Sequence, residues 1–62
     1  MTAQEFIAWR EHLALNRREA AEALGVSQTT ITAYERARSS VPRVVALACT
    51  AVANNLRPWP IA

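Results

Sequence analysis

The side chains best suited to chemistry in this chain are short polar groups on one predicted helix, over residues 28–36. Helical spacing places three of them, Gln28, Thr29 and Thr32, on one side of that helix together with Ala33, and this side is here called the reading face. A glutamine can form two hydrogen bonds with adenine, a threonine can offer a hydroxyl or touch a thymine methyl, and alanine allows close approach. A surface that serves only solubility would carry glutamate and lysine instead. The reading face is therefore expected to contact base edges, with Gln28 and Thr29 as the strongest candidates.

Positive charge is gathered directly after that helix. Residues 1–35 contain three arginines and five glutamates, whereas residues 36–62 contain four arginines and no acidic residue. All seven basic residues are arginines, whose planar guanidinium suits phosphates and guanine edges. Arg36, Arg38 and Arg43 can therefore bind a phosphate backbone. The alternative is that they form a solvated rim.

A glycine corner is expected to hold the predicted helix at a fixed angle. Gly25 is the only glycine in the chain and can end a helix with a positive φ. Ser27 then suits the N-cap of the next helix, because its hydroxyl can accept from free backbone amides. With this cap, Val26 and Ile31 occupy the two positions of a hydrophobic staple. The pattern predicts a helix, a turn and a second helix across residues 17–36.

This stretch resembles the helix-turn-helix repressors of the Cro and cI type, often called the XRE family. The resemblance rests on small residues in the first helix, the turn, a buried aliphatic residue and a late glutamate: Ala20, Ala21, Gly25, Val26, Ser27, Ile31 and Glu35. It extends from about Phe6 to about Leu56. Ala37 departs from the pattern, because the family usually has glycine there. Arg17 also departs from it, because a glutamine that touches a phosphate is common at that position.

Together, the local signals and the resemblance predict an all-α, compact four-helix domain of the lambda-repressor-like type, without a clear fifth helix. The domain is expected over residues 1–56, with residues 57–62 as a tail and helices at about 2–14, 17–24, 28–36 and 42–54. The resemblance implies that the reading face supplies the base contacts. The expected phosphate contacts are Arg17, Arg18, Ser27, Thr30, Arg36, Arg38 and Arg43.

The first predicted helix has a capping box at Thr2 and Glu5. Phe6, Trp9 and Leu13 follow at helical spacing and are expected in the core. In the resembling family, an arginine at the position of Arg10 forms a partly buried ion pair with the glutamate that matches Glu35. The alternative is two independent exposed charges.

The second predicted helix has a capping box at Asn16 and Glu19, and its small residues face inward. Arg17 and Arg18 lie at the end of this helix where the dipole disfavours positive charge. A bound phosphate would relieve that conflict, since helix N-termini attract anions. Two solvated arginines are an adequate alternative.

The fourth predicted helix starts near Pro42. Its expected inward residues are Val44, Leu47, Ala48, Ala51 and Val52, with Cys49 acting as a small hydrophobic residue. Leu56, Trp59 and Ile61 in the tail are candidates for a dimer contact. Trp59 either folds back over its own domain or packs against a second subunit.

Several function classes are disfavoured by what the chain lacks. With one cysteine, one histidine and no aspartate, the sequence offers no disulfide, no metal cluster and no catalytic constellation, so no enzyme, cofactor or metal is expected. No small-molecule ligand is evident. The N-terminus does not resemble a signal peptide, and the apolar run over residues 44–53 is too short to span a membrane. A reducing, cytoplasmic location is expected, with association with the nucleoid when DNA is bound.

The predicted function is that of a sequence-specific regulator that binds the major groove of double-stranded DNA. The resemblance implies a small phage-like or bacterial repressor that acts as a homodimer on a palindromic operator, and autoregulation is expected by analogy. The alternative is an antitoxin-like or adaptor protein that uses the same fold mainly to bind another protein.

Overall fold

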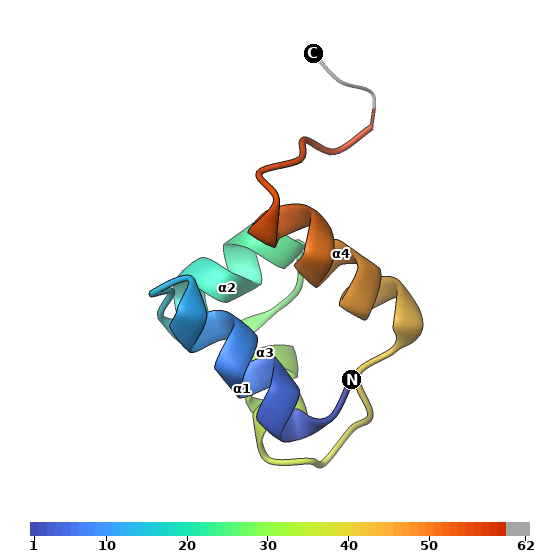
Figure 1. The fold of residues 1–62 in the computed structure, drawn as a ribbon. Helices are drawn as coiled ribbons and strands as arrows, with labels where there is room; N and C mark the ends of the chain where they lie inside the picture. Colours follow the sequence, from blue (N-terminus) through green and yellow to red (C-terminus); the bar gives the residue numbers. More distant parts are fainter. Residues whose placement is uncertain (60–62) are drawn as a thin grey trace.

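The computed structural model describes residues 1–59 and shows four helices in them. These are α1 (Ala3–His12), α2 (Arg17–Leu24), α3 (Gln28–Glu35) and α4 (Arg43–Ala53). The helix α2 packs against both α3 and α4, and α1 packs against α3 (Figure 1). The predicted all-α, four-helix fold is confirmed, and each helix begins and ends within two residues of its expected position.

The first two helices begin with reciprocal side-chain caps. Thr2 Oγ1 accepts from the Glu5 amide at 3.1 Å, and the Glu5 carboxylate accepts from the Thr2 amide at 2.6 Å. Asn16 and Glu19 repeat this arrangement at 2.7 and 2.9 Å. The capping boxes satisfy amides that a helix cannot pair internally. By contrast, the N-cap residue of α4 is Pro42, which makes no side-chain hydrogen bond to the helix.

All four helices are followed by a residue in the left-handed conformation. These residues are Ala14, Gly25, Ala37 and Asn55, with φ angles of 56°, 72°, 55° and 55°. After α3, for example, the Ala37 amide donates to the Tyr34 carbonyl and the Arg38 amide to the Ala33 carbonyl. The same two-bond closure follows α1 and α4. This is the Schellman motif, which pairs the last carbonyls of a helix.

The core is built from all four helices and one loop residue. Its buried members are Phe6, Ala20, Ala21, Ile31, Tyr34, Val41 and Cys49. The Phe6 ring lies 5.4 Å from the rings of both Trp9 and Tyr34, measured between centroids. The Trp9 Nε1 group donates to the Cys49 carbonyl at 2.8 Å. The helix α1 is therefore connected to α3 by aromatic packing and to α4 by a hydrogen bond.

The predicted inward face of α4 was partly wrong. Val44 is 71% exposed and Leu47 is 59% exposed. Cys49 is buried instead, and Val45 packs against the core. The two polar residues of α4, Arg43 and Thr50, lie seven positions apart and so share one side of the helix, and that side, which also carries Leu47, is the exposed one. Within residues 1–59, no helix has the length and hydrophobicity needed to cross a membrane.

The chain after α4 runs away from the helices in Figure 1. Leu56 is 64% exposed and Trp59 is 88% exposed. Trp59 therefore does not fold back over the core in this structure, which was one of the two expected arrangements. Ile61, the third residue considered for a dimer contact, lies outside the described residues.

Candidate nucleic-acid interface

The reading face lies on the outer side of α3. Gln28 and Thr29 are exposed, whereas Ile31 and Tyr34 on the opposite side are buried. Thr32 and Ala33 are partly buried one turn further along, so they can line the base of a contact surface. The structure thus presents these four side chains together, and the first two are open to a ligand.

Ser27 fixes the start of α3, as expected of an N-cap. Its hydroxyl accepts from the Thr30 amide at 3.1 Å and lies 2.9 Å from the Thr30 hydroxyl. When two hydroxyls share one hydrogen bond, the accepting group still has its own proton to donate. Ser27 and Thr30 can therefore cap the helix and still donate a hydrogen bond to a phosphate oxygen.

Three charged side chains meet where α3 ends. The Glu35 side chain is 3% exposed and accepts from Arg10 Nε at 2.5 Å and from Arg10 Nη2 at 3.2 Å. Arg17 Nε also donates to Glu35, at 3.1 Å. Arg10 Nη1 donates to the Leu15 carbonyl at 3.0 Å. This arrangement, here called the Glu35 cluster, joins α1, α2 and α3 through Arg10, Arg17 and Glu35.

The charge of Glu35 is stabilised although the side chain is covered. Burial by itself would raise the pKa of this carboxyl. The hydrogen bonds and positive charges of Arg10 and Arg17 outweigh burial, so the pKa lies below its usual value. Glu35 therefore remains ionised at neutral pH, and the expected ion pair with Arg10 is present.

Four further arginines lie on the surface of α2 and beyond the end of α3. Arg18 is 3.9 Å from Glu22 on the same helix, and both side chains are mostly exposed. Arg36 and Arg38 are exposed on the segment that joins α3 to α4, and Arg43 is exposed at the first position of α4. This segment is anchored by Val41, which is buried. Positive charge thus follows the reading face on a connection that is fixed to the core.

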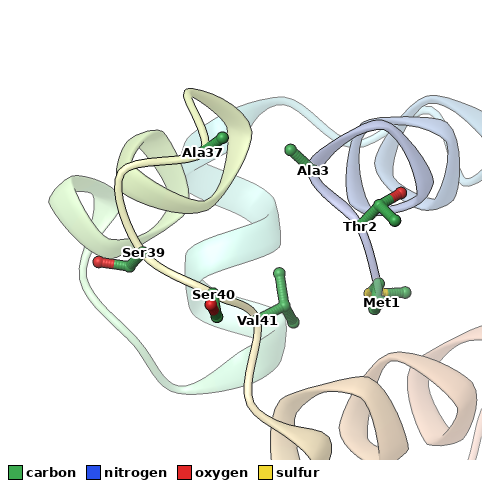
Figure 2. Close-up of a pocket in the computed structure, with 7 residues that line it drawn as sticks. All are labelled: Met1, Thr2, Ala3, Ala37, Ser39, Ser40 and Val41. Atoms are coloured by element: carbon green, nitrogen blue, oxygen red, sulfur yellow. The ribbon is translucent and has the colours of Figure 1, made fainter.

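A shallow hollow of about 190 Å³ lies between that connection and the start of α1. Figure 2 shows its walls, which are formed by Met1, Thr2, Ala3, Ala37, Ser39, Ser40 and Val41. None of these residues has a charged side chain. Elsewhere, burial raises the pKa of Cys49 to about 11, which keeps the thiol protonated and poorly reactive at neutral pH.

Two contacts of this region were missed by the sequence analysis. Arg17 was assigned to phosphate alone, and its bond to Glu35, 18 positions away, has no local sequence signal. The bond from Trp9 to the Cys49 carbonyl was missed because an acceptor on the backbone leaves no trace in residue type.

Comparison with known proteins places this chain in a family. Residues 3–54 match a family model described as a helix-turn-helix domain. The chain therefore belongs to this helix-turn-helix family, of the XRE/Cro-like kind. Membership indicates a DNA-binding regulator. No curated protein and no solved structure matches the chain.

Proposed function

We propose that this chain is a sequence-specific repressor that reads the major groove of double-stranded DNA with α3. The observation that carries the proposal is the uncharged polar face on α3, exposed at Gln28 and Thr29 and followed by three exposed arginines. Side-chain amides and hydroxyls read base edges, whereas arginines bind the backbone. The fold supports this division because α3 is fixed from behind by Ile31 and Tyr34.

Each group of side chains has its own role in the proposed complex. Gln28, Thr29, Thr32 and Ala33 contact bases. The backbone contacts come from Arg18, Ser27, Thr30, Arg36, Arg38 and Arg43. Arg17 was expected among these, but its guanidinium donates a hydrogen bond to Glu35.

The test is selection of binding sites from a random duplex library, followed by titration of variants. Gln28→Ala should weaken binding to the selected duplex by about 1 to 3 kcal/mol and relax preference at one base pair. Gln4→Ala is the matched control, because Gln4 is also an exposed helical glutamine but lies on α1. It should leave binding unchanged. Failure of the wild-type chain to enrich any sequence would refute the proposal, as would equal losses for Gln28→Ala on every duplex.

A homodimer on a palindromic operator is part of the proposal. We propose a domain over residues 1–56 and a tail over residues 57–62. Leu56 at the end of the domain and Trp59 in the tail both have exposed apolar side chains. Two copies would place their α3 helices on half-sites about 34 to 36 Å apart. Selected sequences should then be two-fold symmetric, and Trp59→Ala should shift sedimentation toward monomer. Asymmetric selected sites that are bound by monomers would exclude the dimer. Autoregulation is tested separately, by measuring binding to the DNA upstream of the chain's own reading frame.

The alternative is a module that uses this fold mainly to bind another protein, as an antitoxin-like or adaptor protein would. It is favoured by the exposed Val44 and Leu47 on α4, which a purely DNA-binding monomer would not need. The two functions differ in their dependence on salt. Binding to DNA through several phosphates should weaken steeply as salt rises, whereas an adaptor should show no such binding to any duplex.

A further inference from the structure

Two neighbouring arginines at the start of α2 have different surroundings. The ion pair of Arg17 with Glu35 joins α2 to α3, and the Arg17 side chain is 47% exposed. The ion pair of Arg18 with Glu22 lies within α2 and is longer, with Arg18 68% exposed. Solvated pairs of the second kind contribute little to stability. The two side chains thus have the same charge and lie at the same end of α2. They differ in that Arg17 pairs with another helix, whereas Arg18 pairs within its own.

The bond from Arg17 joins the far ends of the two helices. Arg17 is the first residue of α2 and Glu35 is the last residue of α3, while Gly25 and the following turn connect the other two ends. A pair of helices that is connected by a turn at one end and by an ion pair at the other cannot easily change its angle. The angle between α2 and α3 is what aims the reading face.

The anchor for this bond is itself held by other contacts. The Glu35 carboxylate is almost fully covered and is held by two nitrogens of Arg10, which also binds the Leu15 carbonyl. A hydrogen bond to a covered charged group is stronger than one in open solvent. A phosphate that took Arg17 away would leave this carboxylate with one partner fewer.

We propose that Arg17 is a positioning residue, which aims α3 through Glu35, and that it is not a principal phosphate contact. This inference rests on the proposed function, and it revises the expectation that both arginines at the start of α2 bind phosphate. Arg18 keeps that role. The two substitutions Arg17→Ala and Arg18→Ala form a matched pair, since each removes one arginine from the same helix end.

The first measurement is thermal unfolding without DNA. Arg17→Ala should lower the midpoint by about 4 to 8 °C, because it removes a link between two helices. Arg18→Ala should leave the midpoint unchanged or raise it slightly, because a positive charge is lost from the N-terminal end of a helix. Equal midpoints for the two variants would overturn the proposal.

The second measurement is DNA binding at a temperature where every variant is fully folded. The probes are a duplex selected by the wild-type chain and a scrambled duplex of equal length. Arg17→Ala should reduce the preference for the selected duplex about tenfold, comparable to misplacing one base contact, without changing the salt dependence. Arg18→Ala should weaken both duplexes alike and reduce the slope of log K against log salt by about 0.9.

A simple loss of stability would not change sequence preference in folded protein, so the two measurements separate aiming from folding. Arg17 would be an ordinary phosphate contact if Arg17→Ala behaved like Arg18→Ala. In that case it would reduce the salt dependence of DNA binding and leave the preference for the selected duplex intact. If the wild-type chain selects no duplex, the proposed function fails. The unfolding comparison then still decides whether Arg17 connects α2 to α3.

Discussion

The first three helices and α4 are held in place by different means. In addition to the apolar core that they share, polar contacts fix α1, α2 and α3: α1 and α2 begin with capping boxes, and the Glu35 cluster ties all three together. In contrast, α4 starts without a side-chain cap and attaches mainly through Cys49 and Val45, with a hydrogen bond from Trp9. The part of the chain that includes the reading face therefore has directional interactions, whereas α4 relies on apolar contact.

This difference has a physical reason. Apolar contacts are not directional, so they stabilise many arrangements of similar packing. Hydrogen bonds and ion pairs require particular geometries, so they select one arrangement. A helix that reads bases, as we propose for α3, needs a defined angle. The exposed Val44 and Leu47 on α4 suit a surface that is completed by another molecule.

The largest expected effect comes from breaking the Glu35 cluster. Glu35→Gln keeps the shape of the side chain but leaves Arg10, which is 17% exposed, without its charged partner. We expect the free energy of unfolding to fall by about 3 kcal/mol, the cost of removing one member of a buried pair. Denaturant titration measures it. The control Glu22→Gln, which breaks the exposed pair with Arg18, should change stability by less than about 0.5 kcal/mol.

The contribution of the Arg10–Glu35 pair to stability should depend on pH, because the pKa of Glu35 is lowered in the folded state. A carboxyl with a lowered pKa in the folded state stabilises the fold above its unfolded pKa of about 4.3. That contribution is lost as the pH falls through the folded pKa. The stability difference between the wild-type chain and Glu35→Gln should therefore be largest at neutral pH and shrink below about pH 4. A difference that grows in acid would contradict this account.

A smaller effect is expected where α4 is attached. Trp9→Phe keeps an aromatic ring against Phe6 but removes the donor to the Cys49 carbonyl. We expect a loss of about 1 kcal/mol, the typical worth of one hydrogen bond. Amide hydrogen exchange should show the loss concentrated in α4, with the protection of α3 little changed. Equal loss of protection in both helices would show that α4 and the first three helices unfold as one unit.

The sequence predicted the first three helices well because their signals are local and polar. The caps at Thr2, Asn16 and Ser27 and the corner at Gly25 each specify a boundary through residue type. The inward face of α4 was predicted wrongly because its apolar residues were weighed alone, whereas Arg43 and Thr50 mark the side that is exposed. The second partner of Glu35 could not be predicted, because long-range pairing depends on how the helices pack.

The smallest expected effects concern the left-handed residues at the helix ends. Ala37 and Ala14 adopt φ angles near 55° that cost an alanine about 1 kcal/mol or more, whereas Gly25 adopts a similar angle freely. We therefore expect Ala37→Gly and Ala14→Gly each to raise stability by about 0.5 to 1 kcal/mol, after allowing for the greater freedom of unfolded glycine. Gly25→Ala should lower it by a similar amount.

A Cβ atom at position 25 would have no neighbour within 4 Å, so Gly25→Ala tests backbone conformation without a steric clash. The three variants can be compared by thermal unfolding under one set of conditions. If both alanine-to-glycine changes destabilise the protein, the greater freedom of glycine in the unfolded chain outweighs the relief at the left-handed position. If Ala37→Gly stabilises the protein but weakens DNA binding, the stiff alanine helps to hold the arginine-bearing connection after α3 in its bound shape.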